Sequence, residues 1–338
     1  MKITENYPLK TLNTFALNVD AKYFTTVASK DEIKQSVEIA RQKDVPLLIL
    51  GGGSNLLFES DFPGLVVRNE LKGTSVIDQT DDSVFVKVMG GEIWDDFVKY
   101  CVENGWGGVE NLSLIPGTTG AAPIQNIGAY GAEQKDSFVE LEAYFLKTGK
   151  RKVFSNNECM FGYRTSIFKE KLKGEVFIES VTFKLDRKPT LKTEYGAIER
   201  ELSQIKDRKI TVSDVRNAVI KIRRSKLPDP VELGNAGSFF KNPVVTAGKL
   251  SELKTKSPDI ISYSFGNDSF KLAAGQLIDK CGWKGRREGD AGVHKNQALV
   301  LVNYGNATGK DILLLAGKIQ KSVLEKFGVK LETEVNVV

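Results

Sequence analysis

Two glycine-rich segments carry the residues best suited to bind a nucleotide cofactor. The first, GGGSN at residues 51–55, follows an apolar run that reads as a buried strand. Consecutive glycines permit positive φ angles and let backbone N–H groups converge on an anion such as a pyrophosphate. The spacing does not fit the GxGxxG dinucleotide motif, and residues 56–58 read as a strand rather than a helix. A tight turn is therefore the alternative interpretation.

The second segment, residues 105–131, contains seven glycines and two prolines. A stretch of this length without periodicity is uncommon inside a domain and is usually functional. Its small residues bring backbone close to a flat or phosphorylated ligand, while Gln125 and Asn126 offer directional hydrogen bonds. A long loop packed on itself explains the composition equally well.

Two further segments place a single reactive side chain among small residues. Arg164, in FGYRTS, has the planar fork that binds a carboxylate, although most single arginines are surface residues. Ser238, in GNAGSFFKNP, lacks both the GxSxG context and a convincing base for a serine nucleophile. As a proton donor Ser238 needs only correct positioning. A capped turn is the alternative for this segment.

Composition excludes several classes of function. The single histidine, His294, rules out a multi-histidine metal site, and three widely spaced cysteines give no disulfide framework and fit a reducing compartment. The net charge of +5 suits an anionic small molecule but is not the concentrated basic patch of duplex binding. The N-terminus lacks an apolar signal segment, and no run reaches transmembrane length. We expect a cytoplasmic protein that binds no nucleic acid, membrane or metal.

Hydrophobic periodicity predicts the elements that position these segments. Ser29 and Glu32 form a capping-box pattern ahead of a helix, and Trp94, Phe97 and Cys101 share one face of a second helix. The remaining expected elements are strands at 45–50, 65–68, 84–88, 139–146, 176–185 and 297–303, helices at 215–224, 272–280 and 311–327 (the last starting near Thr308), an irregular segment at 234–243 and a strand-like tail at 329–338.

Six motifs in fixed order resemble the UDP-N-acetylenolpyruvoylglucosamine reductase family over nearly the whole chain: LILGGGSNLLF, PGTTGAAPIQNIGAYG, FGYRTSIF, KLPDP, GNAGSFFKNP and LETEV. The segment around Tyr263 is similar to the family type with an extended substrate domain. The resemblance implies an α+β fold: a two-lobed FAD-binding region of the vanillyl-alcohol-oxidase kind and a C-terminal α+β substrate-binding domain. The expected ranges are 1–70 for lobe 1 with the tail 329–338 returning to it, 71–227 for lobe 2, and 228–328 for the substrate domain.

The same resemblance implies NADPH-dependent reduction of UDP-N-acetylglucosamine enolpyruvate to UDP-N-acetylmuramate, through non-covalent FAD, in peptidoglycan precursor synthesis. Flavin N5 delivers hydride to C3 of the enolpyruvyl group, so negative charge develops at C2 and its carboxylate. Arg164 matches the arginine beside that carboxylate. Glu334 matches a glutamate that we expect to have a raised pKa and to donate a hydrogen bond. Ser238 matches the general acid that protonates C2.

Binding residues follow from the same motifs. Ala121 and Ala122 stand where relatives often carry a hydroxyl, so we expect the backbone to contact FAD there. The expected cofactor residues are Gly51, Gly52, Gly53, Ser54, Asn55, Gly117, Thr119, Gln125, Asn126, Gly128, Tyr130, Gly131 and Arg223. The expected substrate residues are Tyr163, Tyr195, Lys226, Asn242, Tyr263 and Gln297. A monomer is expected, because no exposed apolar helix stripe stands out.

Two other functions stay open on sequence grounds. Another flavin oxidase or dehydrogenase would share the glycine segments but need not combine Arg164, Ser238 and Glu334. Many such enzymes attach flavin through His or Cys, and neither residue occurs in residues 51–55 or 116–131. A non-catalytic UDP-sugar-binding module would keep Lys226 and Tyr195 without a flavin cradle. Flavin absorbance and NADPH consumption that depends on the enolpyruvyl substrate separate the three functions.

Overall fold

The computed structural model describes all 338 residues, which group by their contacts into two units. Unit 1 comprises Met1–Tyr7, Ala21–Gly52 and Pro63–Ser225; unit 2 comprises Pro8–Asp20, Gly53–Phe62 and Lys226–Val338. One boundary lies inside the first glycine segment, between Gly52 and Gly53. The division into two lobes and a substrate domain stays a prediction.

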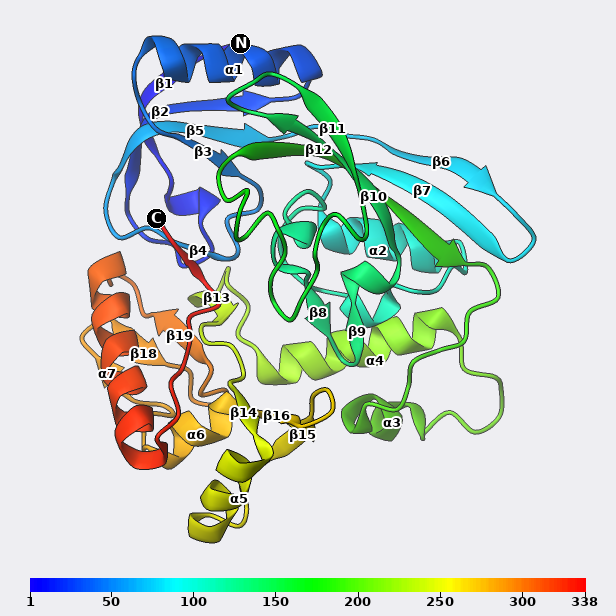
Figure 1. Ribbon diagram of the computed structural model, residues 1–338, viewed down its shortest axis with the longest axis vertical. Helices are drawn as coiled ribbons and strands as arrows, with labels where there is room; N and C mark the ends of the chain where they lie inside the picture. Colours follow the sequence, from blue (N-terminus) through cyan, green and yellow to red (C-terminus); the bar gives the residue numbers. More distant parts are fainter. The chain divides into compact units, whose positions relative to one another are not determined.

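Unit 1 contains two larger sheets and the helices packed on them (Figure 1). The strand orders are β1–β2–β5–β3 and β11–β10–β12–β7–β6, and β8–β9 forms a small hairpin. Its elements are β1 (Thr4–Pro8), β2 (Asp20–Val27), α1 (Lys30–Gln42), β3 (Leu47–Leu50), β5 (Phe62–Asn69), β6 (Thr74–Gln79), β7 (Ser83–Met89), α2 (Trp94–Glu103), η2 (Glu110–Leu112), η3 (Ala122–Gln125), β8 (Gly128–Ala129), β9 (Ala132–Glu133), η4 (Gln134–Asp136), β10 (Phe138–Phe145), β11 (Arg151–Ser155), β12 (Val176–Asp186), α3 (Gly196–Leu202) and α4 (Val212–Lys226).

The first glycine segment begins where β3 ends. The predicted helix α1 is confirmed, and Ser29 caps it by accepting a hydrogen bond from the Glu32 backbone N–H. Ile33, Val37 and Ala40 are buried on its inner face. Strand β3 pairs in parallel with β5, with Leu47 opposite Leu65. This parallel pair directs the chain into residues 51–55 at the carboxyl end of β3.

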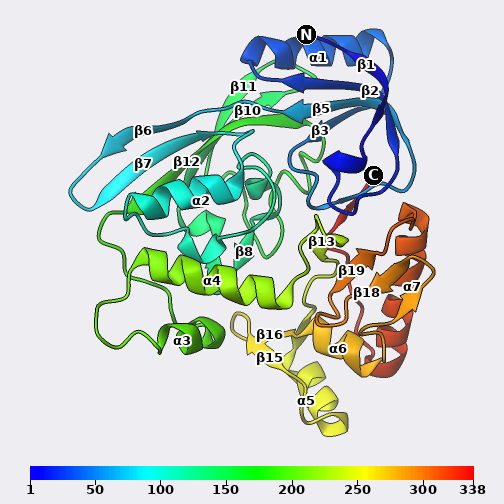
Figure 2. The same cartoon turned by 180° about the vertical axis from the view of Figure 1, so that it is seen from behind.

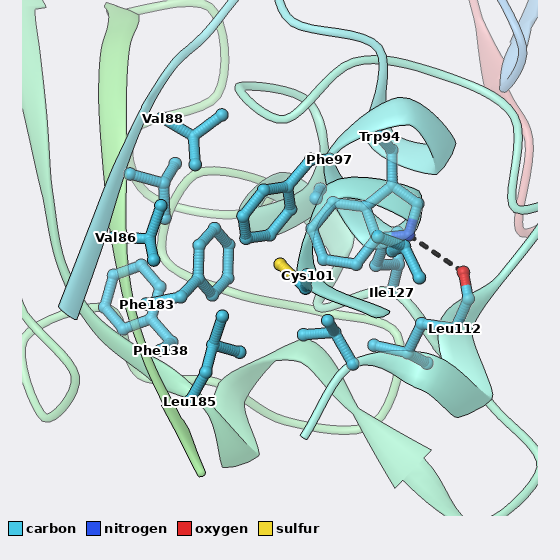
Figure 3. Packing of buried hydrophobic residues seen from close by; sticks show 14 of the residues in the cluster. Val86, Val88, Trp94, Phe97, Cys101, Leu112, Ile127, Phe138, Phe183 and Leu185 are labelled. Atoms are coloured by element: carbon cyan, nitrogen blue, oxygen red, sulfur yellow. Dashed lines mark hydrogen bonds between the residues drawn. The ribbon is translucent and has the colours of Figure 1, made fainter. Parts of the chain in front are cut away.

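The core of unit 1 lies between α2 and the five-stranded sheet (Figure 3). Trp94 and Phe97 on α2 pack against Phe183 of β12, with ring centroids 5.7 Å and 5.0 Å from that of Phe183. The indole Nε1 of Trp94 donates a 2.9 Å hydrogen bond to the carbonyl of Leu112, inside the second glycine segment. Packing of α2 therefore holds the first half of that segment.

Replacing Trp94 by phenylalanine should lower the free energy of unfolding by about 1–3 kcal/mol, because the fully buried Leu112 carbonyl loses its donor. Equilibrium urea unfolding measures the change. The matched control is Trp106→Phe, at a half-buried indole without such a bond. Equal effects of both substitutions would contradict a role for the hydrogen bond.

Unit 2 contains a four-stranded sheet, ordered β13–β19–β18–β17, with α7 packed on β18 and β19 (Figure 2). A second sheet has the order β14–β16–β15, and β20 pairs with β4. Its elements are η1 (Lys10–Leu12), β4 (Leu56–Leu57), β13 (Gly234–Ser238), β14 (Val244–Thr246), α5 (Ala247–Lys256), β15 (Ser262–Ser264), β16 (Ser269–Leu272), α6 (Ala274–Lys280), β17 (Arg287–Glu288), β18 (Ala291–Val293), β19 (Val300–Asn303), α7 (Gly309–Phe327) and β20 (Asn336–Val337).

Four predictions in unit 2 need correction. The strand predicted at 297–303 begins only at Val300. Residues 234–243 are not irregular throughout, because Gly234–Ser238 forms β13 and pairs with β19. Leu272 ends β16, so the predicted helix begins only at Ala274. The tail is a strand only at Asn336–Val337, which pairs in parallel with β4. The helix predicted after Thr308 is confirmed, with Thr308 and Asp311 forming a capping box. None of the helices is long and apolar enough to cross a membrane.

Candidate functional site

Gly51 and Gly52, the first two residues of the first glycine segment, meet the second glycine segment inside unit 1. A Cβ atom on Gly51 would lie 2.6 Å from Oγ1 of Thr118, and one on Gly52 would lie 2.8 Å from Cα of Gly117. A Cβ atom at either position would be too close to its neighbour: Gly51 packs against the Thr118 side chain, and Gly52 packs against the Gly117 backbone. The structure therefore brings together two parts of the predicted cofactor site, Gly51–Gly52 and Gly117.

The second segment is fixed to the residues that precede α2. Thr119 N–H donates to the Glu92 carbonyl at 2.8 Å, and Gly120 N–H donates to the Gly90 carbonyl at 2.9 Å. Thr119 is fully buried, and its hydroxyl has no hydrogen-bond partner within the protein. An unsatisfied buried hydroxyl costs free energy unless a ligand or water completes it. Thr119 thus has the property expected of a cofactor contact.

Two buried asparagines hold the end of the second segment. The Asn111 side-chain amide donates to the carbonyls of Tyr130 and Lys192, at 3.0 Å and 2.9 Å. Asn126 adopts φ 46°, and its amide donates to the Gly162 carbonyl at 3.0 Å and to Glu133 at 2.9 Å. These hydrogen bonds of the Asn126 side chain position the loop, and a contact from it to FAD stays a prediction.

Arg164 stands at the tip of a tight hairpin. An isolated antiparallel β-bridge pairs Gly162 with Thr165, so Tyr163 and Arg164 are the two turn residues. Arg164 has φ 55°. Its Nη2 donates to the Gly128 carbonyl, and its Nη1 lies 2.9 Å from where a Gly128 Cβ would be. The guanidinium therefore lies directly over Gly128, in the second glycine segment. This places the predicted carboxylate-binding arginine beside predicted cofactor residues.

Arg223, Tyr130 and Tyr195 form a second cluster in unit 1. Tyr130 and Tyr195 meet edge to face, with ring centroids 5.3 Å apart, and the Tyr130 side chain is hydrogen-bonded to Arg223. Burial, followed by the attraction of Arg223, leaves the pKa of Tyr130 above its usual value. The Nε atom of Arg223 is buried and has no hydrogen-bond partner within the protein. Three residues predicted separately therefore lie together.

Ser238 and Glu334 are neighbours within unit 2. A bridge between Phe240 and Thr333 aligns the two segments, and the Glu334 N–H donates to the Phe239 carbonyl at 2.8 Å. The Asn55 side-chain amide donates to the Glu334 carbonyl at 3.3 Å. Two predicted catalytic residues and one predicted cofactor residue thus converge, although they come from three distant parts of the chain.

Asn242 and Gln297 both lie at the first turn of α6. Oδ1 of Asn242 accepts a 3.0 Å hydrogen bond from Ala274 N–H, and Oε1 of Gln297 is 3.0 Å from where a Gly275 Cβ would be. Lys226 is exposed at the end of α4, and Tyr263 is 50% exposed on β15. The structure thus brings Asn242 and Gln297 together, but it does not place Lys226 and Tyr263 with them.

Sequence reasoning did not identify Asp95, Arg216 or Asn111. Asp95 accepts two hydrogen bonds from Arg216, at 2.7 Å and 2.9 Å, and one from the Leu114 N–H. An acidic residue in the first turn of a helix and an arginine on another helix are individually ordinary, so no local signal marks them. Their importance follows only from the packing of α2 beside α4.

His294 is buried at the edge of the unit 2 sheet, 8% exposed, with its Nδ1 unpartnered. The backbone N–H of His294 donates to the carbonyl of Val300. Val300, on β19, also pairs with Ser238 of β13. Burial, together with the charge of Lys295, lowers the pKa of His294 from its usual 6.5. The buried imidazole is therefore held in its neutral form.

This lowered pKa predicts that acid destabilises the protein. Above pH 6.5 the imidazole is neutral in both states; below it only the unfolded chain gains the proton, so stability falls as pH falls. Urea unfolding at pH 7.5 and 5.5 should show a larger loss for the natural protein than for His294→Gln. The chain has one histidine, so the difference reports this residue alone. Identical losses would contradict the prediction.

Comparison with known proteins decides the family. The profile of an FAD-binding domain matches residues 21–155, and that of the C-terminal domain of UDP-N-acetylenolpyruvoylglucosamine reductase matches residues 229–338. The UDP-N-acetylenolpyruvoylglucosamine reductase of Flavobacterium johnsoniae is 49% identical over 339 residues, covering 100% of both chains. The chain belongs to the UDP-N-acetylenolpyruvoylglucosamine reductase family.

Further members of the reductase family agree. The protein of the same name from Amoebophilus asiaticus is 46% identical over 338 residues, again covering 100% of both chains. The crystal structure of the UDP-N-acetylenolpyruvylglucosamine reductase from Thermus caldophilus covers 99% of this chain and 98% of its own, with a TM-score of 0.69 at 24% identity. The α+β fold, with an FAD-binding domain and the reductase C-terminal domain, is thus confirmed.

The matched ranges of the reductase family divide the site. Both glycine segments lie within the FAD-binding profile, and Ser238 and Glu334 lie within the reductase C-terminal domain. Arg164 falls between the two matched ranges. The predicted roles of individual residues therefore stay predictions, which the geometry above makes specific.

Proposed function

We propose that this chain reduces UDP-N-acetylglucosamine enolpyruvate to UDP-N-acetylmuramate, a step of peptidoglycan precursor synthesis, with bound FAD and with NADPH as electron donor. The observation that carries the proposal is the full-length identity of 49% with a reductase of this name. The neighbouring Ser238 and Glu334 in unit 2 support it, because the reaction needs a proton donor and a second group at the substrate carboxylate.

The residues of unit 1 fit FAD. Gly52 packs against the backbone of Gly117, and the unpartnered Thr119 hydroxyl and Arg223 Nε are polar atoms that a cofactor would satisfy. We assign the pyrophosphate to residues 51–55 and the ring system to residues 117–131. When bound, FAD supplies hydride from N5 to C3 of the enolpyruvyl group. The attachment is non-covalent, since residues 51–55 and 116–131 contain neither His nor Cys.

Arg164 would bind the enolpyruvyl carboxylate. Its Nη2 is held by the Gly128 carbonyl, and that bond fixes the plane of the guanidinium. A charged donor fixed in advance stabilises developing negative charge without reorganisation. As charge grows at C2 during hydride addition, Arg164 would stabilise the carboxylate side of the intermediate, and Tyr163 beside it would contact the substrate.

Ser238 would protonate C2, and Glu334 would donate a hydrogen bond to the same carboxylate. Gly237 has φ 68°, and the β13–β19 register shifts between Asn235 and Ser238. This bulge interrupts the alternation of the strand, and bulges commonly redirect a side chain beside a functional site. The Ser238 hydroxyl and the Glu334 carboxyl then belong to one rigid pair of segments.

The nucleotide-sugar would be bound by the remaining predicted residues. Asn242 and Gln297 are close together at α6, so we assign them to one part of the substrate. Tyr195, Lys226 and Tyr263 are exposed aromatic and cationic groups suited to a sugar and a diphosphate. We further propose the family type with an extended substrate domain, in which the β14–β16–β15 sheet carries Tyr263. The protein would act as a cytoplasmic monomer without nucleic-acid or membrane partners.

The test is NADPH oxidation by the purified protein. We expect flavin absorbance in the purified protein and NADPH consumption that requires UDP-N-acetylglucosamine enolpyruvate. UDP-N-acetylglucosamine, which lacks the enolpyruvyl group, is the matched control substrate. A flavin-containing protein that oxidises NADPH equally with and without the enolpyruvyl compound would favour another flavin oxidase or dehydrogenase. A colourless protein that binds the nucleotide-sugar would favour a binding module.

A further inference from the structure

Asp95 lies where three elements of unit 1 meet. It occupies the first turn of α2, and its carboxylate accepts hydrogen bonds from both terminal nitrogens of Arg216 on α4, at 2.7 Å and 2.9 Å. Oδ1 of Asp95, which accepts one of these bonds, also accepts a hydrogen bond from the backbone N–H of Leu114. Leu114 has φ 58°. Figures 1 and 2 both show α2 running alongside α4. From its place on α2, one carboxylate thus makes hydrogen bonds both to α4 and to the second glycine segment.

Arg216 and Arg223 project from one face of α4. They are seven residues apart, which is close to two helical turns, so both side chains lie on the same side of the helix. Arg216 is 11% exposed and paired with Asp95, whereas Arg223 contacts Tyr130 in the predicted cofactor site. The position of Arg223 is therefore coupled through α4 to the anchor at Asp95.

Asp95 is a negative charge among the positive charges of Arg164, Arg216 and Arg223. Arg223 is repelled by Arg164 and attracted by Asp95. Burial raises the pKa of Asp95, but the hydrogen bonds from Arg216 and Leu114 outweigh it, so the pKa stays below its usual value and the group is ionised at neutral pH. Asp95 is thus a fixed negative charge beside the guanidinium groups of Arg216 and Arg223.

We propose that the Asp95–Arg216 pair, which lies on the same face of α4 as Arg223, sets the reduction potential of bound FAD through its two fixed charges. This inference rests on the proposed function only in requiring that FAD occupies unit 1. Reduction of the flavin adds negative charge, so the potential responds to each fixed charge near it. Neither residue of the pair touches the substrate in this proposal.

The experiment measures the midpoint potential of FAD in the holoenzyme by dye-linked titration. Asp95→Asn removes a negative charge and should raise the potential, whereas Arg216→Gln removes a positive charge and should lower it. We expect changes of about tenfold in the reduction equilibrium, which is about 30 mV for two electrons. The Asp95→Asn, Arg216→Gln double variant should return close to the natural value, because the pair is removed as a neutral unit.

A control separates this role from general stabilisation of α4. Asp214, in the first turn of the same helix, forms a still shorter two-bond ion pair with Arg208, with both distances 2.6 Å. Asp214→Asn should leave the flavin potential unchanged. Urea unfolding of all variants reports the structural contribution of each pair separately.

Several outcomes would overturn the inference. Shifts of the same sign in Asp95→Asn and Arg216→Gln, or stability losses without a shift in potential, would leave Asp95 a structural residue only. If Asp95→Asn does not fold, an unchanged potential in Arg216→Gln overturns the inference, and a lowered one supports it. A protein that binds FAD but ignores the enolpyruvyl substrate would overturn the proposed function without affecting these potentials. A protein that binds no FAD overturns both.

Discussion

Replacing Ser238 by alanine should lower turnover by about two to three powers of ten, the loss typical of removing one preorganised hydrogen-bond or proton donor. Ser238 ends β13, pairs with Val300, and lies one residue from the carbonyl that holds Glu334. Without the hydroxyl, no neighbouring imidazole replaces it, since the one histidine is held neutral and lies beyond Val300 in the sheet. Protonation of C2 would then depend on water.

The two half-reactions separate this effect from a damaged fold. Rapid mixing should show FAD reduction by NADPH at the natural rate in Ser238→Ala, and slow reoxidation by the enolpyruvyl substrate. Ser251→Ala, on the exposed side of α5, is the matched control and should leave both rates unchanged. Loss of both half-reactions in Ser238→Ala would point to misfolding, and intact reoxidation would remove Ser238 as the proton donor.

Replacing Arg164 by lysine should lower kcat/KM for the enolpyruvyl substrate by about 10- to 150-fold, the equivalent of losing one charge-assisted hydrogen bond of about 1.5–3 kcal/mol. Arginine can donate to the Gly128 carbonyl and still present its fork to a carboxylate. A lysine ammonium keeps the charge but has no planar fork, so it cannot make both contacts with the same geometry.

Steady-state kinetics, together with NADPH half-reaction rates, tests this prediction. Because charge at the carboxylate develops during hydride addition, most of the loss should appear in kcat rather than in KM. Arg41→Lys, on the exposed part of α1, is the control and should leave both constants unchanged. A change confined to KM would mean that Arg164 binds the ground state and the transition state equally.

Local signals made the helix starts predictable. Ser29 caps α1 and Thr308 caps α7 as their sequence patterns indicate, because a cap depends on residues within one turn. Strand β13 was missed because two glycines and an asparagine among its five residues give no strand periodicity. It forms only because β19 supplies its partner and a shifted register absorbs the extra residue. Strand pairing of this kind is not encoded locally.

The site was predictable as a set of motifs but not as an arrangement. The order of the motifs indicated Arg164, Ser238 and Glu334 as candidates, and their roles stay predictions. Nothing local indicates that Asn55 bonds to Glu334, 279 residues away. Asp95 had no signal, because its role depends on the packing of α2 beside α4 rather than on its own surroundings in the chain. Long-range pairings and buried ion pairs are therefore what the structure adds.

The pairing of β20 with β4 makes assembly of the site a late event in biosynthesis. During translation, residues 56–57 leave the ribosome long before residues 336–337, with which they pair. Closing a loop of that length costs conformational entropy. The pairing of β4 with β20 can offset this cost only after β20 has been synthesised. The Asn55 side chain can bond to the Glu334 carbonyl only after the tail is made, so a nascent or clipped chain without residues 329–338 lacks that bond and the predicted catalytic residue Glu334.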